Sequence, residues 1–364
     1  MQVNSILERF LIKGAGKHLY RFSNADNKTW LMPTHNMQVA MNLYQPSGRN
    51  GKIMKALFPW LHHLLIIRKI IHAESVYCDI TDELKRLFCH ETEIEFSIFC
   101  GTPCIHQKIT MQISKGKHIL GYCKVTDNKE IALLFRNEAN ILKELGRKGL
   151  KEVPICMFCG EMTDGIKLFI QSTAKTQKSQ VIHEWTALHE NFLDKLYQST
   201  HQFIPFEQSD YYRILTNLQL HIEWIPQEVN GALLTSTINQ ILLHYQGQEV
   251  DFSAYHADFT PWNMFMEGKK LFVFDWEYAQ LTYPPKLDRY HFFTQTAYFE
   301  KHWTISQIIE YINSEQGKWI DQKMYSLYLL EVIARFTVRE KGNINGKMAE
   351  SFQIWIALLE YLQK

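Results

Sequence analysis

The chain has 364 residues, of which 46% are hydrophobic, so it can bury a core and is not intrinsically disordered. Its 39 Lys and Arg residues nearly balance its 38 Asp and Glu residues, so no basic excess indicates a nucleic-acid or membrane partner for the chain as a whole. At roughly 100–200 residues per domain, the length predicts two or three domains or lobes.

The first region, residues 1–91, has no motif that indicates a chemical role. It combines short strand-like pieces at 19–22 and 29–32 with a turn-rich segment at 45–51. No secretory signal is predicted at its start, because Glu8 comes early and no long apolar core follows. We therefore treat residues 1–91 as an N-terminal region of unknown role.

A helix is predicted over residues 53–71, and its part from 57 to 71 is the most apolar stretch of the chain. This stretch is too short to span a bilayer, and it contains Pro59, Arg68 and Lys69. We predict an amphipathic or buried helix and no integral membrane segment. The basic residues leave contact with a membrane surface as an alternative.

The second region, residues 92–173, predicts an antiparallel sheet with one helix packed on it. Residues 106–113 alternate between apolar and polar, and a turn leads to a return strand at 118–125. Apolar residues at three- and four-residue steps then predict a helix over 130–147. Two further strands are predicted at 155–159 and 166–171.

Cysteines are scattered along the chain, and their odd number, seven, argues against a disulfide framework. A reducing, cytoplasmic location fits this usage better. Cys156 and Cys159 form an isolated CxxC, whereas a structural zinc needs two more ligands at matching spacing. Since this pair lies in an apolar run, we interpret it as two small strand residues. The other cysteines are Cys78, Cys89, Cys100, Cys104 and Cys123.

The third region, residues 174–364, is predicted to be mainly helical, with one β-like insertion at 255–274. A β-rich lobe followed by a helical lobe is an α+β arrangement, in which a cleft between lobes is a common ligand site. The predicted helices are 182–202, 211–222, 233–245, 305–313, 320–339 and 348–362.

Polar anchors are densest between His256 and Glu277. Asn263 and Asp275 flank a predicted hairpin with apolar arms, so we expect them to meet, with Asp258 on the entering loop. Two carboxylates and an amide oxygen suit Mg²⁺, and phosphoryl transfer also needs a carboxylate that orients the attacking hydroxyl. Ordinary turn residues are the alternative, but turn chemistry does not require this joint spacing.

The pattern His256-x-Asp258-x-x-x-x-Asn263, followed by Asp275-Trp276-Glu277, resembles the catalytic and metal-binding signature of the aminoglycoside phosphotransferase and choline kinase-like family. These proteins are relatives of protein kinases that phosphorylate small molecules. The resemblance extends over residues 96–293 and is most specific over 255–288. It implies a bilobal protein kinase-like fold with a β-rich N-lobe at 92–173 and a helical C-lobe at 174–364.

The resemblance implies roles for the residues of the signature. Asp258 would accept or orient the proton of the substrate hydroxyl, and His256 would brace the loop. Asn263 and Asp275 would hold Mg²⁺ against the phosphates of ATP.

Two acids near the signature keep alternative roles. Glu277 could be a structural cap or could face a cationic or polyhydroxyl substrate. Asp288, in a Pro-x-x-Asp pattern that resembles the one following the family signature, is expected to hold the catalytic loop.

The family also needs a strand lysine on the nucleotide phosphates and a helix glutamate that orients it. Lys124, on the second predicted strand, and Glu138, in the predicted helix, match in element type and order. Taken alone, both could be solvated surface residues. Lys117 is the second choice for the lysine, although it lies in a turn.

The phosphate-covering loop departs from the family pattern. Its expected equivalent, residues 99–103, has the single glycine Gly101 and a proline, with no GxGxxG. The chain also lacks GxxxxGK[ST], which argues against a P-loop kinase. We expect the adenine against the strand end near Gln171 and Thr173, bonded to the backbone.

The predicted function is therefore the ATP- and Mg²⁺-dependent phosphorylation of a hydroxyl on a sugar, an amino alcohol or an aminoglycoside-like acceptor. A non-catalytic nucleotide-binding scaffold is the alternative, suggested by the degenerate glycine loop. A protein kinase is disfavoured, because no Ala-Pro-Glu segment and no insert of activation-loop size follow Asp275. The sequence does not indicate the acceptor or the oligomeric state.

Overall fold

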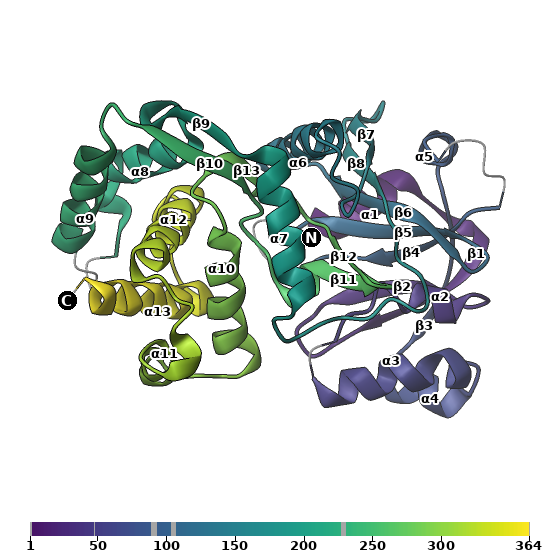
Figure 1. Ribbon diagram of the computed structural model, residues 1–364. Coiled ribbons are helices and arrows are strands. Elements are labelled where there is room, and N and C mark those ends of the chain that lie inside the picture. Colours follow the sequence, from purple (N-terminus) through teal and green to yellow (C-terminus); the bar gives the residue numbers. More distant parts are fainter. Residues whose placement is uncertain (1, 47, 89–92, 103–106, 227–230, 364) are drawn as a thin grey trace. The chain divides into compact units, whose positions relative to one another are not determined.

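The computed structural model describes residues 2–46, 48–88, 93–102, 107–226 and 231–363 (Figure 1). None of the described helices is both long and apolar enough to cross a bilayer. The chain divides into two compact units, and each is described separately. The first unit comprises Met1–Gly146, Lys151–Val181 and Phe265–Glu277, and the second comprises Arg147–Leu150, Ile182–Met264 and Tyr278–Lys364.

An eight-stranded sheet is the frame of the first unit, and each neighbouring pair of strands is antiparallel. In spatial order its strands are β3 (Glu74–Ile80), β1 (Leu11–Ser23), β2 (Thr29–Pro33), β4 (Glu95–Phe99), β5 (Ile109–Lys115), β6 (His118–Thr126), β8 (Lys167–Ser172) and β7 (Cys156–Glu161). The strands predicted before residue 173 are all in this sheet. β3 and β4 were not predicted.

Residues on both sides of position 91 contribute to this one sheet. β2 pairs with β4, placing Trp30 opposite Phe99 and Leu31 opposite Ile98. The boundary predicted after residue 91 falls outside the described residues. Strands from residues 1–91 therefore extend the sheet that residues 92–173 were expected to form alone.

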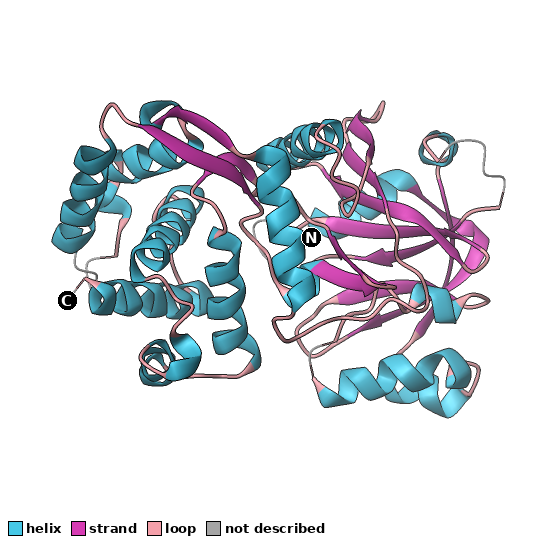
Figure 2. Cartoon of the chain, viewed as in Figure 1, coloured by secondary structure: helices cyan, strands magenta, loops and turns pink. Residues whose placement is uncertain are grey.

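Helices border the sheet, and a small hairpin belongs to the same unit (Figure 2). The α6 helix confirms the predicted helix at 130–147, and its apolar residues Ile131, Phe135 and Leu142 are buried at the expected spacing. The helices are α1 (Gln2–Phe10), α2 (Met37–Ala40), α3 (Arg49–Leu61), α4 (Leu65–Ile70), α5 (Asp82–Arg86) and α6 (Lys129–Arg147), and the hairpin strands are β11 (Met264–Glu267) and β12 (Lys270–Val273).

The single helix predicted over 53–71 is wrong, because the structure has two helices there. Pro59 lies in the last turn of α3 and cannot donate a backbone hydrogen bond. The ring nitrogen Nδ1 of His62 contacts the carbonyl of Pro59 at 3.0 Å, so this carbonyl has a partner outside the helical ladder. The chain turns at this point, and α4 begins at Leu65.

The second unit is mainly helical, as predicted (Figure 2). Its helices are α7 (Ala187–Thr200), α8 (Asp210–Leu220), α9 (Gly231–Tyr245), α10 (Leu287–Gln295), α11 (Ile305–Ile312), α12 (Gln322–Glu340) and α13 (Gly346–Leu362). Short helical turns are η1 (Phe206–Gln208), η2 (Ile222–Trp224), η3 (Pro261–Asn263), η4 (Thr296–Glu300) and η5 (Glu315–Gly317). Its three-stranded sheet has the order β13 (Gln280–Tyr283), β10 (Glu249–Tyr255) and β9 (Gln202–Pro205).

Two helix predictions in this unit need correction. The helix predicted from residue 182 begins at Ala187, because Thr186 forms a capping box with His189. The α10 helix was not predicted. Together the two units nevertheless confirm the α+β class, with a sheet-rich first unit and a helical second unit.

An aromatic-rich core fixes β10 in the second unit. Tyr255, the last residue of β10, is 1% exposed and stacks on Tyr283 of β13 with ring centroids 5.1 Å apart. Tyr211 of α8 packs edge-on against the same Tyr283 ring and donates a hydrogen bond to the carbonyl of Leu327 at 2.9 Å. The end of β10, from which the predicted catalytic loop starts, is therefore held from several sides.

Candidate active site

The loop after β10 is held by Asp288 of α10. One carboxylate oxygen of Asp288 accepts a hydrogen bond from the backbone N–H of His256 at 2.9 Å, and the other accepts from that of Ala257 at 3.1 Å. Ala257 has a φ of +70°, in the left-handed region that side chains with a Cβ seldom adopt. Two bonds to one carboxylate stabilise this turn, which is the loop-holding role expected for Asp288.

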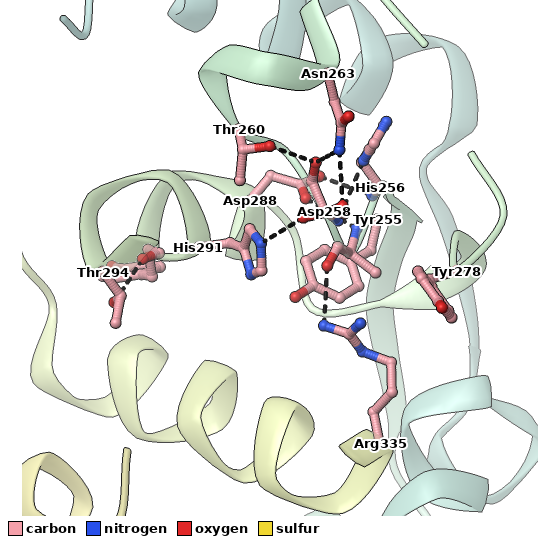
Figure 3. Close-up of polar contacts among 12 residues, drawn as sticks. Tyr255, His256, Asp258, Thr260, Asn263, Tyr278, Asp288, His291, Thr294 and Arg335 are labelled. Atoms are coloured by element: carbon pink, nitrogen blue, oxygen red, sulfur yellow. Dashed lines mark hydrogen bonds and ion pairs between the residues drawn. The ribbon is translucent and has the colours of Figure 1, made fainter. Parts of the chain in front are cut away.

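Asp258 lies at the centre of the hydrogen bonds in Figure 3. The amide nitrogen of Asn263 donates to Asp258 Oδ2 at 2.7 Å and to the Asp258 carbonyl at 3.0 Å. The backbone N–H of Asp258 donates to His256 Nδ1 at 3.2 Å, as expected if His256 braces the loop. The Asp258 side chain is 33% exposed, so a carboxylate of fixed orientation still reaches solvent.

His291 is a contact of Asp258 that the sequence did not predict. Its Nε2 lies 3.3 Å from Asp258 Oδ1 (Figure 3). Its Nδ1 lies 3.3 Å from the hydroxyl of Tyr328. The His291 side chain is only 3% exposed. His291 follows Asp288 by three residues in α10, so the two side chains lie on the same face of the helix. A prediction of α10 would therefore have indicated that His291 lies near the catalytic loop.

Arg335 of α12 is a second residue that the sequence did not predict. Its Nη2 donates to the carbonyl of Ala257 at 2.9 Å, and its Nε donates to Glu331 Oε1 at 2.7 Å. Glu331 in turn accepts from the hydroxyl of Tyr255 at 2.8 Å. The left-handed turn at Ala257 is thus held through its carbonyl as well as its N–H.

Burial dominates the protonation of Asp288. It raises the pKa of this carboxyl to about 7, while the N–H groups of His256 and Ala257 act in the opposite direction. Asp288 is 1% exposed, so these bonds and Arg335 stabilise its charge in place of water. The carboxyl that holds the loop therefore titrates near neutral pH.

In the first unit, Lys124 of β6 lies among three carboxylates. Its Nζ donates to Glu138 Oε2 at 2.6 Å and to Asp275 Oδ1, and it lies 3.6 Å from Glu277 Oε2. Lys124 is 5% exposed. Burial opposes its charge, but the three carboxylates raise the pKa of Lys124 above its usual value, so it stays an ammonium ion.

Glu138 of α6 links this lysine to the segment after β12. One of its oxygens binds Lys124, and the other accepts from the backbone N–H of Trp276 at 3.2 Å. Burial raises the pKa of Glu138, and the ion pair with Lys124 works against this rise. Asp275 has a φ of +69°, and this strained backbone turns its carboxylate toward Lys124.

A second lysine, Lys108, was not predicted for this cluster. Its Nζ contacts Glu277 Oε2 and lies 3.9 Å from Asp275 Oδ1. Thr110 pairs with Lys124 across β5 and β6, and Lys108 comes two residues before Thr110. Since side chains alternate along an extended chain, this register places Lys108 and Lys124 on the same face.

Three carboxylates of the first unit could hold a metal ion. Oxygens of Glu138, Asp275 and Glu277 all lie within 4.8 Å of one another, the one such group found among the described residues. Carboxylate oxygens are the ligands that Mg²⁺ prefers. Glu138 is already committed to Lys124 and Trp276, so Asp275, whose side chain is 24% exposed, is the better ligand.

The CxxC pair has no part in this metal-compatible group. Cys156 and Cys159 lie in β7 and are half-buried, and desolvation raises the pKa of the Cys156 thiol to about 11. Thiols of this kind stay protonated at neutral pH and are poor metal ligands. The interpretation as strand residues agrees with this placement, whereas Cys89 and Cys104 lie outside the described residues.

Gly101 lies in the loop between β4 and β5 and has a φ of +80°. A Cβ at this position would come within 2.2 Å of the Lys108 carbonyl, so no other residue fits without moving the backbone. Gly101 therefore lies where the start of this loop packs closely against the backbone at its end. Pro103, in the same expected loop, lies outside the described residues.

Gln171 and Thr173 lie at the end of β8. Gln171 is 3% exposed, and its side-chain oxygen has no hydrogen-bond partner among the described residues. The hydroxyl of Thr173 accepts a hydrogen bond from the backbone N–H of Lys175 at 3.1 Å. A buried acceptor without a partner is costly, which makes Gln171 a candidate ligand contact.

The structure brings together two groups of predicted residues, each within one unit. Lys124, Glu138 and Asp275 form one group, and Asp258 contacts Asn263 in the other. The predicted β11–β12 hairpin is present. The meeting of Asn263 with Asp275 stays a prediction, since the two residues belong to different units.

No family model matches the chain, and no curated protein matches it in sequence. Solved structures that match it include aminoglycoside phosphotransferase APH(4)-Ia, with 13% identity, 76% of this chain and 96% of that chain covered, and a TM-score of 0.49. Choline kinase LicA from Streptococcus pneumoniae matches with 14% identity, 76% of this chain and 98% of that chain covered, and a TM-score of 0.45.

Proposed function

We propose that the chain transfers the γ-phosphoryl group of ATP to a hydroxyl group of a small molecule, with Mg²⁺ as its metal cofactor. The observation that carries this proposal is the buried ammonium of Lys124, bound at once to Glu138 and Asp275. Burying several charges costs more than an apolar core would, so such a cluster indicates a site kept for function. Lys124 would bind the nucleotide phosphates, and Glu138 would fix its position.

Asp258 is the proposed catalytic carboxylate. Asn263 and His291 bind its two different oxygens, so the side chain is fixed before a substrate arrives. It would accept or orient the proton of the acceptor hydroxyl, and its partial exposure allows a substrate to reach it. His256 acts only through the loop, by accepting the N–H of Asp258.

Asp275 and Asn263 are the proposed ligands of Mg²⁺. Because the amide nitrogen of Asn263 faces Asp258, its amide oxygen is left as the ligand atom. The metal ion would neutralise charge on the phosphates during transfer. Glu277 contacts Lys108 and Lys124, which favours a role within this charged cluster over direct recognition of the acceptor.

The remaining contacts of the nucleotide are proposed from the first unit. Gly101 would let the β4–β5 loop approach the phosphates closely, and Gln171 and Thr173 would lie near the adenine. We also propose a cytoplasmic location, supported by the five described cysteines, which are all free of disulfides.

Turnover and nucleotide binding, measured separately, test this proposal. Wild-type protein given MgATP and a panel of sugars, amino alcohols and aminoglycosides should release ADP with at least one acceptor. The Asp258→Asn variant should bind ATP as wild type does in calorimetry but lose at least about 100-fold in turnover. Asp251→Asn, a change in the same chain segment that keeps an acceptor for the Tyr197 hydroxyl, is the matched control.

ATP binding without turnover on the whole panel would favour the non-catalytic alternative. An unchanged turnover of Asp258→Asn would refute the assigned role of Asp258.

A further inference from the structure

Helices α3 and α4 carry a surface that the proposed function does not use. Both pack one side against an aromatic cluster of the first unit, through Met54 and Phe58 from α3 and Ile67 from α4. In Figure 1 both helices lie at the border of this unit. Their opposite sides therefore point away from the sheet.

The outward side of these helices is apolar. Trp60, Leu65, Ile66 and Ile70 are each 67–68% exposed, although Ile, Leu and Trp normally bury most of their surface. Together with Arg49, Lys52 and Lys69, which are also exposed, we call these residues the α3–α4 surface. Its apolar members are Ile53, Leu57, Trp60, Leu64, Leu65, Ile66 and Ile70.

These large exposed apolar side chains lie within 18 consecutive residues. They therefore form a patch, whereas isolated exposed apolar side chains are scattered over a surface. Patches of this kind mark contact with a protein or a membrane. The patch lies on α3 and α4 and includes no residue of the sheet or of the charged cluster around Lys124.

The charged residues of this segment are all basic. Residues 49–73 contain five Lys and Arg residues and no Asp or Glu, in a chain whose net charge is +1, so the rest of the chain carries a net charge of −4. Lys55 is partly buried, and Arg68 packs on the ring of Tyr20, whereas Arg49, Lys52 and Lys69 are exposed. The exposed cations lie on the same two helices as the apolar patch.

We propose that the α3–α4 surface docks the protein on the surface of an anionic lipid bilayer. The helices would lie in the plane of the interface, with Trp60 and the aliphatic side chains in the headgroup region and the lysines at the phosphates. Tryptophan prefers this zone, because its ring is apolar and its N–H is polar. The proposal is independent of the proposed kinase activity.

Charge complementarity favours a bilayer over a second copy of this chain. A two-fold interface through this surface would bring each Arg49, Lys52 and Lys69 set against an identical one. Anionic lipids neutralise the same charges, and their acyl chains accept the apolar patch. None of the helices spans the bilayer in this arrangement, in agreement with their short length.

Flotation of the full-length protein with vesicles tests this proposal. Wild type should float with vesicles of mixed phosphatidylglycerol and phosphatidylcholine and not with phosphatidylcholine alone. The double variant Lys52→Glu/Lys69→Glu should lower the affinity at least about tenfold. The triple variant Trp60→Ser/Leu65→Ser/Ile66→Ser should lose binding, although its melting temperature should be unchanged because all three side chains are exposed.

The matched control is Leu220→Ser/Leu243→Ser, which removes two side chains of the second unit that are 75% and 73% exposed. It should float as wild type does. Failure of wild type to bind anionic vesicles, or equal binding by the triple variant, would overturn the proposal. A wild-type dimer that the triple variant converts to monomer, without vesicle binding in either, would show a self-association surface instead.

Discussion

Three side chains fix the candidate catalytic residue. Asn263 and His291 bind different oxygens of Asp258, and His256 accepts its backbone N–H. A carboxylate held in this way has lost most of its rotational freedom, so less ordering is needed when the acceptor binds. His291 touches neither the nucleotide nor the acceptor in our assignment and is therefore a positioning residue.

Replacing His291 should disturb the orientation of Asp258 without changing the binding of ATP. We expect His291→Ala to lower kcat about tenfold or more, because one oxygen of Asp258 loses its partner, while the KM for ATP stays unchanged. His291→Gln, which keeps a donor near Asp258, should recover part of the loss. Steady-state kinetics would check this, and a change confined to the KM for ATP would contradict the positioning role.

Asp288 should make stability depend on pH. Its folded-state pKa is raised to about 7 from an ordinary value of 3.8, so between these values the folded protein holds a proton that the unfolded chain has lost. The contribution of Asp288 to stability is therefore greatest below the lower value and falls as the pH rises through about 7. Asp288→Asn, which does not titrate, should lack this fall.

Urea unfolding of both proteins across the range from about pH 4 to 8 measures this difference. If the free energies of unfolding of wild type and Asp288→Asn change with pH in parallel over this range, the raised pKa of Asp288 is contradicted. At low pH, where the wild-type carboxyl keeps its proton, the variant should be destabilised by about 1–3 kcal/mol, because one of the two N–H groups of the loop then faces an amide nitrogen. This deficit should shrink as the pH rises through about 7, because only wild type loses stability there.

At the scale of elements, α12 stabilises the loop through a buried ion pair. Arg335 and Glu331 lie one turn apart, and their side chains are 12% and 1% exposed. Removing one partner leaves a buried charge uncompensated, so Glu331→Gln should lower the free energy of unfolding by about 3–5 kcal/mol. Glu315→Gln, in the exposed pair with Lys318, should change it by less than about 1 kcal/mol.

Urea denaturation curves of these two variants provide the measurement. Equal effects of the two changes would show that Arg335 is neutralised by something other than Glu331.

Local patterns predicted the elements that carry the site. The apolar arms around Glu267 and Gly268 predicted the β11–β12 hairpin, and the three- and four-residue spacing predicted α6. The α10 helix was missed, because nearly all of its residues are buried, so it shows no amphipathic period. With it, His291 was missed as a partner of Asp258.

The roles of Lys108 and Arg335 needed tertiary contacts. Lys108 joins the charged cluster only because β5 and β6 pair in a register that places Thr110 opposite Lys124. Arg335 reaches Ala257 across 78 residues of sequence. No local pattern specifies either contact.

At the scale of the whole molecule, residues 1–91 are part of the sheet. The pairing of β2 with β4 joins segments more than 60 residues apart, which composition and turns could not indicate. Deleting residues 1–91 would expose the backbone edge of β4 together with Phe96 and Ile98, which are buried. Exposed apolar edges of this kind promote aggregation.

We therefore expect a chain that starts at residue 93 to be insoluble or to melt far below the full-length protein. Size-exclusion chromatography and thermal denaturation would check this. A monomeric fragment with an unchanged melting temperature would show that residues 93–364 fold without the N-terminal strands.

The most direct test of the proposed kinase activity is mass spectrometry of acceptor panels incubated with MgATP. We predict that wild-type protein adds one phosphoryl group to at least one hydroxyl compound, that Lys124→Met and Asp258→Asn do not, and that Asp258→Asn still binds ATP. A phosphorylated product formed equally well by Asp258→Asn, or no product from wild type with any hydroxyl acceptor, would contradict the proposed function.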